Sequence, residues 1–184
     1  FGTSIFGELG HVGPDAYDYG VFDDYFATVL DAVPDAVFLP HLELPAPPWW
    51  SKEHPEEMCL YSNGAQGPTS LASELWRKEM GEDLRRLIRH LRQAPYADRI
   101  LGFILCSGYT AEWQMWATWQ DYGDDYSVPA RRAFRAWLKR AYGSDAALQA
   151  AWRDPAVTLD TAEPPPFEKR RYGAEGPFLL DPAA

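Results

Sequence analysis

Two short apolar runs with a long helical pattern between them constrain the fold of this chain most strongly. The runs are residues 36–39 and 100–106, and neither alternates with polar residues. Such runs are typical of strands covered on both faces, as in a parallel sheet. Ser70 can cap the intervening helix, which we expect to continue to about Gln93. Strand, helix and strand form one βαβ unit, which predicts a parallel sheet with a right-handed crossover.

The segments on either side of the first run are predicted to be a helix before it and a loop after it. Residues 20–33 repeat apolar side chains at helical spacing, and Pro34 ends the pattern. Residues 40–50 contain too many prolines for a central strand, so we expect a loop there. We expect residues 51–69 to be irregular.

After the second run the chain becomes helical. Ser127 and Pro129 predict a helix start, and Gly143 predicts its end. Ser144 can cap a shorter helix that stops before Pro155. Trp76, Trp137 and Trp152 fall on helical faces and are expected in the core.

Charge and composition exclude several kinds of partner. The 184 residues include 17 basic and 27 acidic ones, which gives a net charge of −10. We therefore expect no nucleic-acid partner and, without an apolar run of about 18 residues, no membrane span. Cys59 and Cys106 are too isolated for a metal site and are predicted to be buried thiols, and no cofactor is expected. Localisation and oligomeric state stay open.

The carboxyl ends of the two predicted strands are where chemistry is expected, because parallel α/β folds bind ligands there. Glu112 is the sharpest candidate, since it follows a buried strand and precedes Trp113. Aromatic surroundings raise the pKa of a carboxyl group, as a general acid requires. The alternative is a surface glutamate at the start of a helix.

Side chains typical of sugar-binding sites surround this candidate. His41 and Glu43 alternate after the first run, so both can face one pocket, although a structural His and an exposed Glu are the alternative. A paired Trp can offer flat faces to pyranose rings or can anchor a loop by packing. The predicted substrate contacts are His41, Glu43, Trp49, Trp50, Tyr109, Trp113 and Trp116.

Four motifs along the chain add to this interpretation, and the segment from Ala133 to Trp152 is the most specific. In it, Phe-Arg-x-Trp-Leu and Tyr-Gly are followed by Leu-x-x-x-Trp. The other three motifs are Asp15-Ala16-Tyr17-Asp18-Tyr19, Pro45-Ala46-Pro47-Pro48-Trp49-Trp50 with His54-Pro55-Glu56, and Ile100-Leu101-Gly102-Phe103 with Glu112-Trp113. In type and in order, the four motifs resemble those of glycoside hydrolase family 42.

The resemblance implies a retaining β-galactosidase-type enzyme that acts on a carbohydrate, with Glu112 as acid/base. It implies an α/β fold, a partial (β/α)₈ barrel of about strands 2 to 4, because a complete barrel needs at least about 200 residues. Residues 1–163 would belong to the catalytic barrel, and residues 164–184 would be a Pro- and Gly-rich loop leading to the remainder. The nucleophile would lie outside this chain, so the isolated chain is expected to be inactive. Ala111 departs from the Asn that usually precedes the acid/base.

Two alternatives remain from the sequence. One is a catalytically silent, carbohydrate-binding relative of the barrel enzymes. The other is a non-catalytic α/β interaction domain whose aromatic residues simply fill its core.

Overall fold

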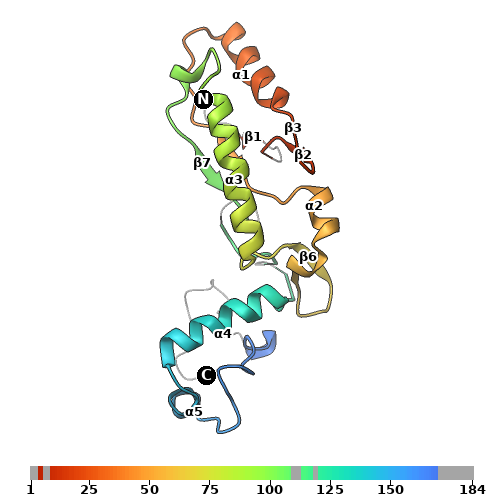
Figure 1. The fold of residues 1–184 in the computed structure, drawn as a ribbon, viewed down its shortest axis with the longest axis vertical. Coiled ribbons are helices and arrows are strands. Elements are labelled where there is room, and N and C mark those ends of the chain that lie inside the picture. The colour runs from red at the N-terminus through yellow and green to blue at the C-terminus, as the bar shows by residue number, and fades with distance from the viewer. Residues whose placement is uncertain (1–3, 6–8, 109–112, 118–119, 170–184) are drawn as a thin grey trace.

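A parallel three-stranded sheet organises the N-terminal two thirds of the molecule. The structure is a computed structural model that describes residues 4–5, 9–108, 113–117 and 120–169. The sheet has the strand order β1 (Ser4–Ile5), β4 (His41–Glu43) and β7 (Ile104–Cys106). Both pairings are parallel. The sheet and its crossover helix confirm the predicted βαβ unit (Figure 1).

The central strand lies later in the chain than the apolar run predicts. β4 follows Pro40, and the predicted strand at residues 36–39 contributes only an isolated parallel bridge between Phe38 and Ile100. The expectation that the prolines exclude a central strand was wrong at this point. Pro40 has no N–H to donate, but its carbonyl oxygen accepts the N–H of Ile104 at 2.9 Å. The hydrogen bonds between β4 and β7 therefore extend to Pro40, which takes part through its carbonyl oxygen.

Two helices cover one face of this sheet. α1 (Gly20–Ala32) confirms the predicted helix, and Phe22 and Phe26 are its buried residues. α3 (Glu74–Leu91) packs Leu87 and Leu91 into the same core, together with Phe38 and Leu42 of the sheet. The capping residue is Ser73, whose Oγ accepts the N–H of Trp76, and the short helical segment η2 (Ala97–Arg99) leads back to the sheet.

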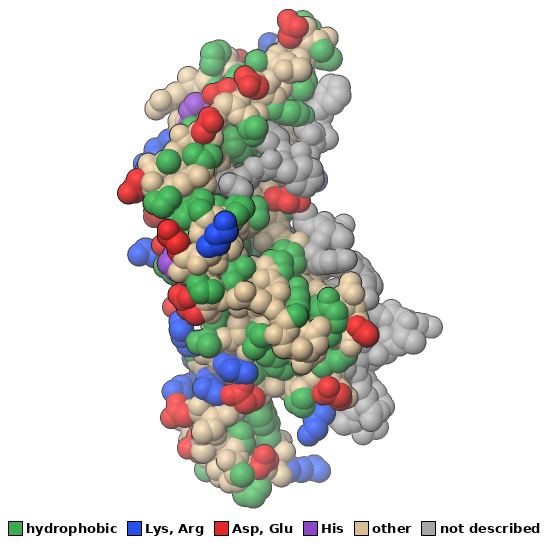
Figure 2. Space-filling view, turned by 90° about the vertical axis from the view of Figure 1, so that its right-hand side faces the viewer, with side chains coloured by type: hydrophobic (Ala, Val, Ile, Leu, Met, Phe, Trp, Pro, Cys, Tyr) green, Lys and Arg blue, Asp and Glu red, His purple; other side chains and the backbone are tan. Residues whose placement is uncertain are grey.

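The opposite face of the sheet is exposed. From residue 36 to residue 42 the even-numbered positions are buried, whereas Val37 is 43% and Leu39 is 40% exposed. Leu101 on the neighbouring segment is 71% exposed. The apolar run thus has two apolar faces, and among the residues that the structure describes the helix-covered face is the buried one. Figure 2 shows broad areas of hydrophobic side chains at mid-height of the face that it draws.

Short elements extend from the carboxyl ends of the strands. An antiparallel hairpin, β2 (His11–Gly13) with β3 (Ala16–Tyr17), follows β1. α2 (Pro48–Glu53) and η1 (Pro55–Glu57) follow β4. A second hairpin pairs β5 (Met58–Leu60) with β6 (Gln66–Thr69), so residues 51–69 are not irregular as predicted. The sequence signal for this hairpin was Asn63-Gly64 at its turn.

A pair of helices lies at the end of the molecule opposite α1 (Figure 1). α4 (Val128–Tyr142) and α5 (Asp145–Trp152) confirm the predicted helices and their serine caps. Gly143 ends α4 with a φ of 72°, a left-handed conformation that favours glycine. Leu138 and Leu148 form the core of this pair.

Two predicted core residues, however, are exposed. Trp137 is 50% and Trp152 is 38% exposed, so the expectation that both lie in the core was wrong, while Trp76 is buried as predicted. Helical spacing identifies a shared face but does not show how far the core extends over it. Cys59 and Cys106 are free and buried, which confirms their prediction as buried thiols.

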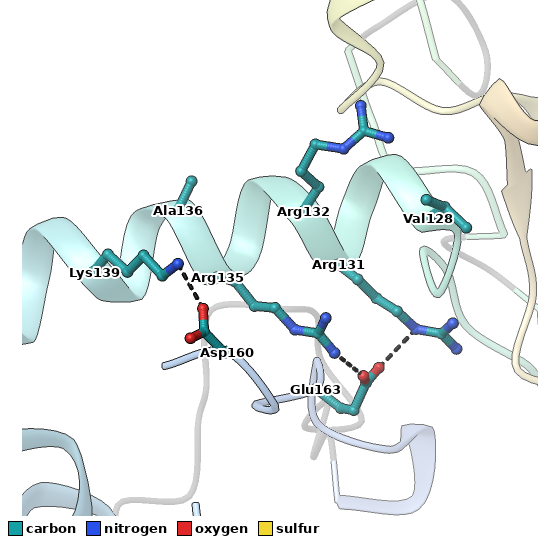
Figure 3. Close-up of a pocket in the computed structure, with 8 residues that line it drawn as sticks. All are labelled: Val128, Arg131, Arg132, Arg135, Ala136, Lys139, Asp160 and Glu163. Atoms are coloured by element: carbon teal, nitrogen blue, oxygen red, sulfur yellow. Dashed lines mark hydrogen bonds and ion pairs between the residues drawn. The ribbon is translucent and has the colours of Figure 1, made fainter. Parts of the chain in front are cut away.

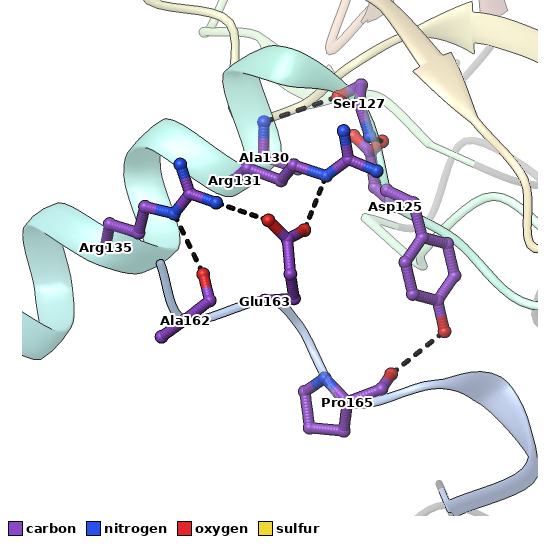
Figure 4. Close-up of polar contacts among 9 residues, drawn as sticks. Asp125, Ser127, Ala130, Arg131, Arg135, Ala162, Glu163 and Pro165 are labelled. Carbon is purple, nitrogen blue, oxygen red and sulfur yellow. Dashed lines mark hydrogen bonds and ion pairs between the residues drawn. The ribbon is translucent and has the colours of Figure 1, made fainter. Parts of the chain in front are cut away.

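Acidic residues after α5 hold the chain against α4. Glu163 bridges Arg131 and Arg135, and Asp160 pairs with Lys139 (Figure 3). Arg135 also donates to the carbonyl oxygen of Ala162 at 2.8 Å (Figure 4). The short helical segment η3 (Phe167–Lys169) follows these acidic residues in the chain.

Candidate functional site

The carboxyl ends of β4 and β7 lie side by side. Glu43 is in register with Cys106, and the N–H of Leu44 donates to the carbonyl oxygen of Cys106 at 3.0 Å. The loops that leave the two strands therefore start from the same edge of the sheet. This is the edge at which parallel α/β folds place their ligand sites.

His41 and Glu43 both lie on the sheet face opposite the helices. Leu42, between them, is buried in the helix-covered core, and strand geometry turns its two neighbours to the other face. Both side chains are half-buried. Burial and the charge of Glu43 raise the pKa of the Cys106 thiol, so this cysteine stays a thiol rather than a nucleophilic thiolate.

The indole groups of Trp113 and Trp116 bind backbone oxygens near the same edge of the sheet. The indole nitrogen of Trp113 donates to the carbonyl oxygen of Leu105 in β7 at 2.8 Å, and its ring is 54% exposed. Trp113 has a φ of 59°, which is uncommon for a bulky residue. The indole nitrogen of Trp116 donates to the carbonyl oxygen of Thr69 at 2.9 Å. Glu112 and Tyr109 lie outside the described residues.

The paired tryptophans have different environments. Trp50 is fully buried, packs with Trp76 and Met80, and donates to Glu79 at 2.6 Å. It is placed as a packing anchor rather than as a face open to a ligand. Trp49 is half-buried, and its indole nitrogen donates to the carbonyl oxygen of His11 at 3.2 Å. The two neighbours thus connect α2 to α3 and to the β2–β3 hairpin.

A small pocket lies at these strand ends. It has a volume of about 90 Å³ and is lined by residues from the loop after β4, the β5–β6 hairpin, the first turns of α3 and the loop after β7. The lining includes Leu44, Ala46, Met58, Thr69, Leu71, Trp76, Ser107 and Trp116. Trp116, a predicted substrate contact, is therefore part of a formed pocket.

A larger hollow of about 540 Å³ runs along α4, and both acidic residues in its lining are already paired with basic ones. Figure 3 shows Glu163 between Arg131 and Arg135, and Asp160 beside Lys139. The hydrogen bond from Lys139 and its positive charge lower the pKa of Asp160. We interpret this hollow as the junction between α4 and the segment after α5 that contains Asp160 and Glu163.

Sequence reasoning missed three buried or half-buried carboxylates that join distant segments. Asp83 bonds His11 and Tyr17, Asp23 bonds His90 and Tyr96, and Asp125 bonds Ser70 and two backbone amides. Apart from Ser127, whose N–H lies two residues from Asp125, the partners lie far away in sequence, so local spacing does not identify these contacts. Within the described part of the chain no group of three metal-ligating side chains is present, and no helix there is long and apolar enough to cross a membrane.

Comparison with known proteins decides the family. The family model for β-galactosidases of glycoside hydrolase family 42 matches residues 13–156. The chain belongs to glycoside hydrolase family 42. A comparison with curated protein sequences gave no match.

Solved family 42 β-galactosidases share the fold of this chain. The β-galactosidase from Bacillus circulans sp. alkalophilus superposes with a TM-score of 0.67 at 17% identity, over 94% of this chain and 25% of its own. The enzyme from the psychrophilic Marinomonas ef1 gives 0.67 at 17% identity, over 90% and 26%. That from the Antarctic haloarchaeon Halorubrum lacusprofundi gives 0.62 at 17%, over 86% and 24%.

The chain therefore spans about a quarter of the length of these structures. Together with the parallel sheet, this confirms the expected fold, which is part of a (β/α)₈ barrel. The family 42 motif at residues 133–152 coincides with α4 and α5, and the proline-rich motif at residues 45–50 leads into α2.

Proposed function

We propose that this chain supplies the acid/base half of the active site of a retaining β-galactosidase. The observation that carries the proposal is the family match over residues 13–156, which includes the loops at the carboxyl ends of both β4 and β7. The solved enzymes with the same fold are β-galactosidases. The substrate would be a β-linked galactoside bound over this edge of the sheet.

In this proposal Glu112 is the general acid. Its carboxyl proton passes to the glycosidic oxygen while the bond from that oxygen to the anomeric carbon breaks. A second carboxylate, supplied by the part of the enzyme beyond the quarter that this chain covers, forms a bond to the anomeric carbon. Glu112, now ionised, then takes a proton from the water that releases the sugar. The roles of acid and base thus alternate on one residue.

The side chains at the strand ends would bind the sugar. His41 and Glu43 share a face and offer hydrogen-bonding groups to its hydroxyls. The half-exposed Trp113, which follows Glu112 in the sequence, is held by its bond to Leu105 and so offers a fixed aromatic surface. Holding such groups in place before binding reduces the entropy lost when the substrate is oriented.

One sequence feature favours a second candidate function. Ala111 occupies the position at which these enzymes usually have an asparagine, and alanine offers no hydrogen bond to the 2-hydroxyl. A relative that binds carbohydrate without hydrolysing it would retain the aromatic residues while losing this contact. Turnover measurements separate the two functions, because binding alone consumes no substrate.

The test is the Glu112→Gln variant of the full-length protein on ordinary galactosides. We expect turnover to fall by about 10²–10⁴-fold, the usual contribution of general acid catalysis. Glu82→Gln is the matched control, since Glu82 lies on the exposed side of α3 and bonds only Arg85 among the described residues. Equal turnover of both variants would rule out Glu112 as the acid. Galactoside binding without any wild-type turnover would favour the silent relative.

A further inference from the structure

Trp76 has a buried indole N–H without a hydrogen-bond acceptor in the part of the chain that the structure describes. The residue lies in the first turn of α3 and is 4% exposed. The indole nitrogens of four other tryptophans, Trp49, Trp50, Trp113 and Trp116, each donate to an oxygen. Buried polar groups are rarely left unpaired, so this N–H needs an explanation.

The pocket of about 90 Å³ that Trp76 lines is walled mostly by apolar side chains, among them Leu44, Ala46 and Met58. Ser51 already donates its hydroxyl to the carbonyl oxygen of Pro47, and the backbone carbonyl oxygen of Thr69 accepts the indole N–H of Trp116. Because most of the lining is apolar, it suits an apolar group that carries one hydrogen-bond acceptor.

The position of the pocket connects it to the proposed chemistry. Ser107, in its wall, directly follows β7, and the loop that contains Glu112 begins there. Trp116, which also lines the pocket, follows the same loop. Two lining residues therefore precede and follow, in the sequence, the loop that contains Glu112, and the link to the leaving group rests on the proposed function.

We propose that this pocket binds a short apolar group that carries one oxygen, such as an alkyl alcohol or ether, and that Trp76 donates its indole N–H to that oxygen. The volume equals about three water molecules at about 30 Å³ each, which is too small for a sugar ring. The occupant is therefore part of the leaving group rather than the galactosyl unit. Apolar pockets with a few placed polar groups are the usual form of small-molecule sites.

The test follows the indole ¹H–¹⁵N resonances of the chain while 1-propanol or glycerol is added. Trp76→Phe, which keeps a ring but removes the N–H, assigns the Trp76 signal among the eight tryptophans. We expect 1-propanol to shift this signal saturably and glycerol, which lacks an apolar body, to leave it unchanged. Equal, linear shifts of all indole signals, or no shift at Trp76, would overturn the proposal.

A second variant keeps the test decisive if Trp76→Phe does not fold. Ala46→Leu leaves the indole in place and fills the pocket, so it should abolish the saturable shift. Trp137→Phe is the matched control on the distant helix pair, and it should bind 1-propanol as the wild type does. Unchanged binding by Ala46→Leu would place the alcohol elsewhere and contradict the proposal.

These measurements need no turnover, so the two proposals can fail separately. If the Trp76 signal shifts saturably but Glu112→Gln does not lower turnover, the pocket proposal stands and the assignment of Glu112 as the acid fails. If Glu112→Gln loses turnover but the Trp76 signal does not shift, the assignment of Glu112 stands and the pocket proposal fails.

Discussion

Asp83 on α3 lies 2.8 Å from the Nδ1 atom of His11 on β2, across 72 positions of the chain. The same carboxylate accepts the hydroxyl of Tyr17 on β3 at 2.8 Å, and its side chain is only 2% exposed. The carbonyl oxygen of His11 in turn accepts the indole of Trp49. Asp83 therefore fixes the β2–β3 hairpin on α3 and, through it, one side of the loop after β4.

Removing this carboxylate should destabilise the protein. Asp83→Ala removes the partner of the buried His11 ring and of the half-buried Tyr17 hydroxyl, so the free energy of unfolding should fall by about 1–3 kcal/mol. Tyr17→Phe, which removes one donor and leaves the ring stacked on His11, should cost about 1 kcal/mol. Urea unfolding of the variants measures both changes. A wild-type midpoint for Asp83→Ala would show that the hairpin is held by other contacts.

The contact between α1 and α3 should weaken in acid. Burial acts to raise the pKa of Asp23, but hydrogen bonds from Tyr96 and His90 and the charge of His90 outweigh it and lower the pKa. A lowered folded pKa adds stability above the unfolded value of 3.8 that is lost as the pH falls through the folded value. The free energy of unfolding should therefore drop below about pH 4, and Asp23→Asn should reduce this drop. The exposed neighbour variant Asp24→Asn should keep the wild-type profile.

Asp125 should be needed to hold the β5–β6 hairpin and the start of α4 together. Its carboxylate accepts Ser70 Oγ at 2.5 Å, the Leu60 N–H at 3.2 Å and the Ser127 N–H at 2.9 Å. Asp125→Ala should speed amide hydrogen exchange at Leu60 and Ser127 and lower the unfolding free energy by about 1–3 kcal/mol. Ser70→Ala removes one bond and should leave both amides protected. Unchanged exchange in Asp125→Ala would contradict this role.

The open face of the sheet should bind an apolar dye in the isolated 184-residue chain. Val37, Leu39 and Leu101 are exposed there, and contiguous exposed apolar surface of this kind attracts partners or dyes. We expect fluorescence enhancement of ANS that falls in Leu39→Ser and Leu101→Ser. Val128→Ser, which changes an exposed residue at the start of α4, should not reduce it. Equal enhancement by all variants would place the dye site elsewhere.

The helices could be predicted because their signals are local. Ser127 and Gly143 bound α4, and the apolar spacing of residues 20–33 matches α1. The central strand could not be placed as well, because an apolar run with two apolar faces gives no alternation to fix its limits. Pro40 then concealed the continuation of the strand, although its carbonyl oxygen still pairs with β7.

The candidate site was predictable only in part. The rule that ligands bind at the carboxyl ends of parallel strands selected the two segments that the register of Glu43 and Cys106 brings together. Sequence could not distinguish Trp49 from the buried Trp50, because their environments depend on α3 and on the β2–β3 hairpin. The contacts of Asp83 with His11 and Tyr17, and of Asp125 with Leu60 and Ser70, depend on tertiary structure.

The central claim is that Glu112 donates a proton to the leaving group of a galactoside, and leaving-group dependence tests it most directly. In the full-length protein, Glu112→Gln should slow the bond-breaking step strongly for galactosides whose leaving alcohol needs a proton. It should slow the step far less for activated aryl galactosides, whose leaving groups depart as anions. Pre-steady-state release of the aryl or alkyl alcohol measures this step for each substrate. Equal slowing for both classes of leaving group would contradict the assignment of Glu112 as the acid.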